Sequence, residues 1–191
     1  MRNLKFVRAL MFFAAVAAAL AGGAASAANK TQVVNVAGIQ SYDLYGEAGN
    51  TVVELNLGAL AQVTSIAWNF NITAYDPSWL ADMEAHFSSS AGSDGVVFTP
   101  SDTFNSGSEH REGSANLVDL GLDFKVGADG KLRIEFSENY KDLNPGEADG
   151  QWDSGSFTIG YVSAVPEPSS YGMLLLGLAA MGAVARRRQN R

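Results

Sequence analysis

The 191-residue sequence contains no cysteine, only two histidines and five prolines, and fewer basic than acidic residues. Without cysteine the protein has no disulfide framework, thiol nucleophile, zinc ribbon or iron–sulfur cluster. Its 13 Lys and Arg against 20 Asp and Glu give a formal net charge of −7, which argues against nucleic acid as a partner. The length fits one ordinary domain.

The first 27 residues have the three-part layout of a secretory signal peptide. A positive region comes first, formed by Arg2, Lys5 and Arg8. An apolar run over residues 9–21 follows, and it is shorter than the ~20 residues that a membrane-spanning helix needs. The small residues Ala25 and Ala27 then predict cleavage before Ala28. We therefore expect removal of residues 1–27 on export, in preference to a retained anchor.

The C-terminal residues 165–191 predict a second membrane-directed segment. Residues 169–185 carry no charge and would span about 25 Å as a helix, slightly less than the ~30 Å hydrocarbon core of a bilayer. A basic cluster follows at once: Arg186, Arg187 and Arg188. Because cationic flanks stay in the cytoplasm, this transmembrane helix would leave the rest of the chain on the exported side of the inner membrane.

Pro166, Glu167 and Pro168 precede the apolar stretch and favour an extended, accessible backbone. Together with the apolar stretch and the Arg cluster, this triplet resembles the PEP-CTERM sorting signal. The resemblance implies that an exosortase, a membrane-embedded transpeptidase resembling cysteine proteases, recognises the triplet and releases the protein from its helix. It also implies a Gram-negative bacterium that makes extracellular polysaccharide and biofilm.

The body, residues 28–164, is strongly acidic and has the pattern of an all-β domain. It holds six Lys and Arg against 19 Asp and Glu, a net charge of −13, which suits a soluble protein with some affinity for divalent cations. Apolar residues alternate with polar ones over 66–72, 132–136 and 157–161, with further candidate strands over 53–57 and 83–87. Short strands separated by glycine-rich turns predict an antiparallel β-sandwich.

Local signals add detail to this sandwich. Asp129-Gly130 predicts a hairpin between 124–126 and 132–136. Asp76 and Pro77 predict one helical turn, with Asp76 as its cap, and Thr99–Ser114 reads as a polar loop. The order of 130–134, the acidic loop 142–149 and 152–155 loosely resembles the jelly-roll domain beside subtilisin-like proprotein convertases, which implies a jelly-roll-like sandwich.

The loop 141–153 is rich in oxygen ligands of the kind that calcium prefers. The candidate ligands are Asp142, Asn144, Glu147, Asp149 and Asp153. The spacing is not that of an EF-hand. An acidic, solvated loop whose Asp and Asn residues form turns explains the same composition, and it is the favoured interpretation.

No pattern of catalytic residues emerges from the sequence. His86 is expected on the polar face of a strand and His110 on the 99–114 loop, and no Gly-x-Ser-x-Gly motif accompanies them. Trp79 and Trp152 lie near turns, where they would either stack on a sugar or pack at an edge, and packing is favoured. We therefore predict a protein that is not an enzyme.

The sequence as a whole predicts an exported structural protein of the cell surface or extracellular matrix. Its expected partners are the export machinery, an exosortase and exopolysaccharide. It would be anchored in the membrane until processed and then be surface-bound or extracellular. A carbohydrate- or calcium-binding module of the matrix is the alternative, and a secreted hydrolase is the least favoured one.

Overall fold

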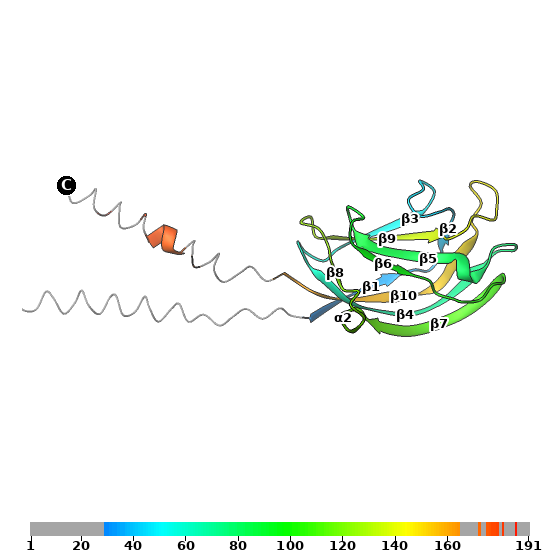
Figure 1. Ribbon diagram of the computed structural model, residues 1–191, viewed down its shortest axis with the longest axis horizontal. Helices are drawn as coiled ribbons and strands as arrows, with labels where there is room; N and C mark the ends of the chain where they lie inside the picture. The colour runs from blue at the N-terminus through cyan, green and yellow to red at the C-terminus, as the bar shows by residue number, and fades with distance from the viewer. Residues whose placement is uncertain (1–28, 165–171, 173–174, 180, 182–185, 187–191) are drawn as a thin grey trace, which may run out of the picture. The chain divides into compact units, whose positions relative to one another are not determined.

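The computed structural model describes residues 29–164 and, within the tail, residues 172, 175–179, 181 and 186. The body consists of two antiparallel β-sheets packed face to face (Figure 1). Sheet A contains, in spatial order, β1 (Asn29–Asn35), β10 (Gly150–Val162), β4 (Gln62–Ala74) and β7 (Gly107–Asn116), with β2 (Ile39–Ser41) and β8 (Phe124–Lys125) added alongside β10 and β4. Sheet B contains β3 (Thr51–Asn56), β9 (Lys131–Glu138), β5 (Met83–Ser89) and β6 (Gly95–Phe98).

The eight longer strands form nested pairs. β1 pairs with β10, β3 with β9, β4 with β7, and β5 with β6, so that the first strand meets the last and the middle strands meet each other. This is the connectivity of a jelly roll. The predicted all-β sandwich is therefore confirmed, while the resemblance to the convertase-associated domain stays a prediction.

A core of aromatic rings joins the two sheets. Phe157 of sheet A packs edge to face against Phe87 of sheet B, with ring centroids 5.0 Å apart, and Trp152 meets Phe136 at 5.3 Å. Phe70 packs against both Trp152 and Phe157. These rings are buried because the alternation in β4, β5, β9 and β10 directs every second residue between the sheets. The strands predicted from alternation are confirmed.

The predicted hairpin at Asp129-Gly130 is wrong. β8 before this turn pairs with β4 in sheet A, whereas β9 after it pairs with β3 and β5 in sheet B, so the turn carries the chain from one sheet to the other. Gly130 has φ 75°, and a Cβ there would lie 2.6 Å from the Gly58 carbonyl carbon. The turn signal was sound, but the strand before it is only two residues long and belongs to the other sheet.

Two further local predictions need correction. The helical turn is a 3₁₀-helix, η1 (Leu80–Asp82), which Trp79 precedes without a side-chain cap. Asp76 and Pro77 instead form a tight turn that Ser78 N closes on Tyr75 O at 2.7 Å. The predicted loop 99–114 is wrong from residue 107 onward, because Gly107–Asn116 forms β7, followed by the short helix α2 (Leu117–Leu120).

The inward positions of β7 explain why its sequence concealed a strand. Glu109 and Arg111 occupy them as an ion pair, with Arg111 Nη2 2.6 Å from Glu109 Oε2. Thr103 Oγ1 and Ser101 Oγ donate to Glu109 at 2.6 and 2.9 Å. Because the segment 99–106 covers this edge with polar groups, β7 needs no apolar alternation.

The body has two distinct ends. Asn29 pairs with Val162, so the first strand begins and the last strand finishes at one end, which we call the tail end. At the opposite end, the loop end, lie the connections 42–50, 75–79, 99–106 and 139–149 (Figure 1). The chain therefore leaves the sandwich far from its longest loops.

Candidate functional site

The outer face of sheet A is a continuous polar surface. On β4 it exposes Asn69 and Asn71 between the inward-facing Phe70 and Ile72. The register of β1, β10, β4 and β7 places further hydroxyl and amide side chains beside them. The neutral polar residues at these outward positions are Thr31, Asn35, Ser65, Thr73, Ser108, Ser114, Asn116, Ser154, Ser156 and Thr158.

Cross-strand hydrogen bonds hold this surface in order. Asn71 Nδ2 donates to Ser154 Oγ of β10 at 2.8 Å, and Asn71 Oδ1 lies 3.3 Å from His110 Nδ1 of β7. One row along, Asn69 Nδ2 donates to Glu112 Oε2 at 3.2 Å. The surface therefore presents polar groups whose rotamers are already constrained.

A groove of about 640 Å³ crosses the same face near the tail end. Thr31 of β1, Gly160 of β10, Ser65 of β4 and Asn116 of β7 occupy one row beneath it. A Cβ at Gly160 would collide with Ser65 Oγ, so glycine keeps the floor of the groove low. The groove is thus a concave part of this face. Hydroxyl and amide groups make up much of its lining, and Lys30, Ala115, Val118, Tyr161 and Val162 complete it.

The outer face of sheet B is covered by the 42–50 loop. Gly46 N and Asn50 Nδ2 donate to Glu135 Oε1 at 2.7 and 2.8 Å, and Arg133 Nη2 lies 2.5 Å from Glu135 Oε2. Burial pushes the pKa of the Glu135 carboxyl upward, but these hydrogen bonds and the Arg133 charge outweigh it and hold the pKa below its usual value. Glu135 is therefore a charged anchor that holds the loop through Oε1 and faces Arg133 through Oε2.

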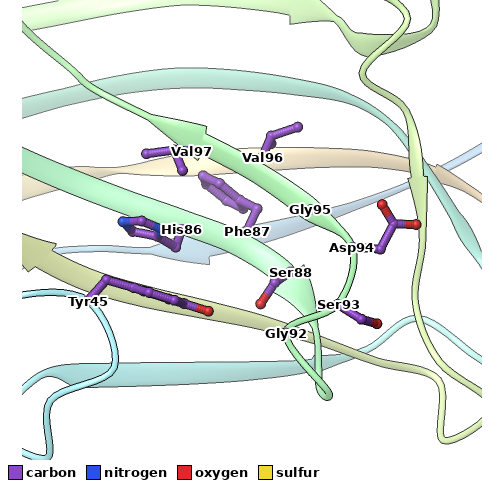
Figure 2. A pocket seen from close by; sticks show the side chains of 10 residues that line it. All are labelled: Tyr45, His86, Phe87, Ser88, Gly92, Ser93, Asp94, Gly95, Val96 and Val97. Carbon is purple, nitrogen blue, oxygen red and sulfur yellow. The ribbon is translucent and has the colours of Figure 1, made fainter.

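A small pocket of about 290 Å³ lies at the edge of this covered face. Figure 2 shows the Tyr45 ring lying along the His86 ring, and the two centroids are 4.1 Å apart at 17°. His86 Nε2 lies 2.8 Å from Glu84 Oε2, and the Arg133 guanidinium lies 5.9 Å from the Tyr45 ring centroid. The turn bearing Asp94 forms the opposite wall (Figure 2). His86 is therefore half-buried beneath Tyr45. The sequence predicted a surface position for this residue.

Glu138 is a buried carboxyl where the loop end meets β9. Ser41 Oγ donates to Glu138 Oε1, while Glu138 N donates to Asp43 O at 2.9 Å. Burial raises the pKa of Glu138 to about 8, and the neighbouring carboxylates of Asp149 and Asp82 add to the effect. The carboxyl is accordingly protonated at neutral pH. Nothing in the sequence distinguished this residue.

The structure separates the five candidate calcium ligands. Asp149 is buried and paired with Lys141 Nζ, and it accepts the backbone N–H groups of Asp142 and Leu143. Asn144 Nδ2 donates to Glu147 Oε2 at 3.0 Å. Asp153 lies on the sheet A face, where Thr73 Oγ1 and Gln151 Nε2 donate to it at 2.7 and 3.0 Å. Within residues 29–164, no group of three His, Asp or Glu side chains is placed to hold a metal ion.

The remaining residues singled out in the sequence are the tryptophans Trp79 and Trp152 and the histidine His110. Trp152 is fully buried, so its packing interpretation is confirmed and the sugar-stacking one is wrong. Trp79 is 45% exposed and meets the 66% exposed Phe104 edge to face, with centroids 5.6 Å apart. His110 lies on β7 and contacts Asn71 and Glu112, and no serine or threonine hydroxyl is hydrogen-bonded to either histidine in the described body.

The tail supplies the decisive comparison. A model of the PEP-CTERM protein-sorting motif matches residues 164–189, a range that contains Pro166, Glu167, Pro168, Arg186, Arg187 and Arg188. The chain carries a PEP-CTERM sorting motif. Such a motif implies export, C-terminal membrane anchoring and processing by an exosortase, and the predicted resemblance is thereby confirmed.

The PEP-CTERM match begins just after the last strand, so it describes the tail and not the body. Comparison with curated proteins gave no match. A similar solved structure is the infectious bursal disease virus VP2 subviral particle, at 8% identity and a TM-score of 0.33 over 69% of this chain and 32% of that one. The chain thus spans about a third of the VP2 chain.

Most of the PEP-CTERM tail and the predicted signal cleavage site at Ala25, Ala27 and Ala28 lie outside the described residues, as do Pro166, Glu167 and Pro168. The described tail residues 175–179 are helical. Among the residues that can be described, no helix is long and apolar enough to span a bilayer.

Proposed function

We propose that this protein is a non-catalytic structural component of the bacterial cell surface or extracellular matrix, associated with exopolysaccharide and biofilm. The observation that carries the proposal is the PEP-CTERM motif at residues 164–189. The chain would be anchored by its tail, processed by an exosortase and then left at the surface or in the matrix.

The position of the tail suits the display of the body. The last strand finishes at Val162, beside Asn29, and the loop end lies at the other extreme of the sandwich. A body attached through residue 164 would therefore keep the connections of the loop end away from the attachment point.

The environment of the polar side chains supports a role other than catalysis. His86 is stacked on Tyr45 and paired with Glu84, while the buried Asp149 is paired with Lys141. A general base needs a free lone pair within reach of a nucleophile or substrate. His86 instead fixes the position of Tyr45 of the 42–50 loop, and Asp149 fixes the conformation of the 139–149 loop.

The test is the mass and location of the protein in its own organism. We expect intact-mass measurement of the surface or medium fraction to give a chain starting at Ala28 and finishing near Pro166–Pro168. Replacing Pro166, Glu167 and Pro168 by alanine should leave a larger, membrane-held form. Normal release of that variant would contradict the proposal.

A matched control removes the same residue types from an exposed loop of the body. Pro145→Ala with Glu147→Ala should leave processing unchanged. If this control is also retained in the membrane, retention reports a folding defect and not recognition of the motif.

A second candidate function, a carbohydrate-binding module of the matrix, is favoured by one observation. The outer face of sheet A combines exposed hydroxyl and amide groups with a groove, the kind of polar surface that binds sugar hydroxyls.

A further inference from the structure

We propose that the outer face of sheet A binds an uncharged polysaccharide chain. The inference deepens the proposed function and rests on it for the source of the polymer. It concerns the face formed by β1, β10, β4 and β7, with the groove over Thr31, Gly160, Ser65 and Asn116 as its most concave part.

The chemistry of the face matches that of a sugar polymer. Serine and threonine hydroxyls donate and accept, and asparagine amides do both with separate atoms. Sugar hydroxyls have the same dual character, so every row of the face can exchange hydrogen bonds with a chain laid across it. Asn69 and Asn71 are exposed at the centre of these rows.

The distribution of charge selects a neutral polymer. The body carries 19 acidic and six basic residues, yet the outward positions of the described sheet A strands include only two carboxylates, Asp153 and Glu112. One lysine, Lys30, lines the groove. Asp153 already accepts from Thr73 and Gln151, and Glu112 accepts from Asn69. An anionic chain would be repelled by the acidic body, and a cationic one would prefer the acidic surfaces elsewhere.

The order within the face lowers the entropic cost of binding. Asn71 is held between Ser154 and His110, and Thr73 Oγ1 lies 2.6 Å from Ser108 Oγ. A ligand therefore meets side chains already fixed across three strands, and it need not immobilise each of them. Asn69 and Asn71 stay exposed although they take part in these bonds.

The composition of the face also argues against a protein partner. Cores of protein–protein interfaces are enriched in aromatic residues, methionine and arginine. Within the described strands of sheet A, the one large apolar side chain exposed on this face is Val33, and Val118 of α2 adds a second one beside the groove. Neither a methionine nor an arginine lines the groove. A second copy of the chain is therefore a less suitable occupant than a hydrated polymer.

The experiment uses the full chain purified in detergent and the extracellular polysaccharide of the producing organism. Anion exchange separates that polysaccharide into uncharged and anionic fractions, and each is immobilised for interferometry. We expect binding to the uncharged fraction. The double variant Asn69→Ala with Asn71→Ala should weaken it by about tenfold or more through loss of hydrogen bonds.

The matched control is Asn105→Ala with Asn144→Ala, which removes two exposed asparagines from loops at the other end of the sandwich. It should change binding by less than about twofold, within the scatter expected for surface substitutions. Thermal unfolding of both double variants checks that the fold is intact.

Several outcomes would overturn the inference. The first two are binding only to the anionic fraction and binding to neither fraction. The third is loss of binding in the control variant or in Trp79→Ala while the sheet A variant still binds. The fourth is self-association of the protein that the sheet A variant abolishes. A processed, matrix-located protein without polysaccharide binding refutes this inference alone. An unprocessed, cytoplasmic protein refutes the proposed function.

Discussion

The two outer faces of the sandwich have the same strand architecture and opposite surroundings. On sheet A, Asn69, Asn71 and Glu112 are exposed. On sheet B, Glu135 and Ser137 are fully buried beneath the 42–50 loop and its neighbours. A polar residue on the outer side of a strand is therefore exposed on one face and a covered structural anchor on the other.

The difference arises from the connections and not from the strands. The 42–50 loop reaches over sheet B because Glu135 gathers its Gly46 and Asn50 donors and because Tyr45 stacks on His86. Burying these polar groups costs free energy unless each one is paired, which explains the dense network beneath the loop. On sheet A the polar side chains bond to one another across the strands, and Asn69 and Asn71 stay exposed.

The largest expected effect comes from Glu138, a buried acid between the two sheets that Ser41 of sheet A contacts. A pKa raised from 4.5 to about 8 stabilises the fold below pH 4.5, and this stabilisation is lost as the pH rises toward 8. The free energy of unfolding of wild type should therefore fall by about 3 to 5 kcal/mol more between pH 5 and pH 9 than that of the Glu138→Gln variant. Urea titrations at both pH values measure the difference.

The control for Glu138 is the same substitution on the open face. Glu112→Gln should keep the pH dependence of wild type, because Glu112 is exposed. Parallel stability curves for wild type and Glu138→Gln would show that burial does not hold the Glu138 proton.

Glu135→Gln should have the next largest effect, because it removes the charge that pairs with Arg133 and anchors the loop. Leaving the partly buried guanidinium without its carboxylate should cost about 2 to 3 kcal/mol at pH 7. Chemical denaturation gives the value, and Glu112→Gln again serves as the reference, expected within about 0.5 kcal/mol of wild type. Equal effects of the two substitutions would mean that the two faces are energetically alike.

Two asparagines, one on each face, test the comparison of the two sheet faces without a change of charge. Asn50 accepts from Asp43 N at 2.9 Å and donates to Leu44 O and Glu135 at 2.7 and 2.8 Å, whereas Asn69 makes one exposed bond at 3.2 Å. Asn50→Ala should destabilise by about 1 to 2 kcal/mol and expose the loop to proteolysis. Asn69→Ala should change stability by less than about 0.5 kcal/mol. The comparison fails if Asn69→Ala proves the more damaging substitution.

The sequence predicted the parts of this molecule that depend on local pattern. Alternation identified β4 and β9, and with them the buried Phe70 and Phe136. The sorting tail was recognisable because its three parts are contiguous, and the motif match at 164–189 confirms it. Both signals lie within stretches short enough to read directly.

Features that depend on distant segments were not predictable in this way. Glu135 alternates with apolar neighbours as an exposed residue would, and only the 42–50 loop, about 90 positions earlier in the chain, buries it. β7 was missed because the ion pair of Glu109 and Arg111 replaces apolar inward residues. The neutral face of sheet A requires the register of four strands, which no single stretch encodes.

The addition of calcium should have the smallest effect on the stability of the protein, because the candidate ligands already have partners within the protein. Asp149, the most buried candidate ligand, is already neutralised by Lys141 and two backbone N–H groups, and Asp153 is bonded to Thr73 and Gln151 on the outer face of sheet A. A cation would have to displace Lys141 from Asp149 and draw Asp153 away from these partners. We therefore expect millimolar calcium to shift the melting temperature by less than about 1 °C. A site that bound calcium tightly would instead add about 2.7 kcal/mol to the free energy of unfolding at 100 times its Kd. The variant Lys141→Met serves as the comparison, because it removes the lysine that pairs with Asp149. If calcium raises the melting temperature of this variant alone, the lysine occupies the place of the cation. If calcium raises the melting temperature of wild type, the loop is a metal site after all.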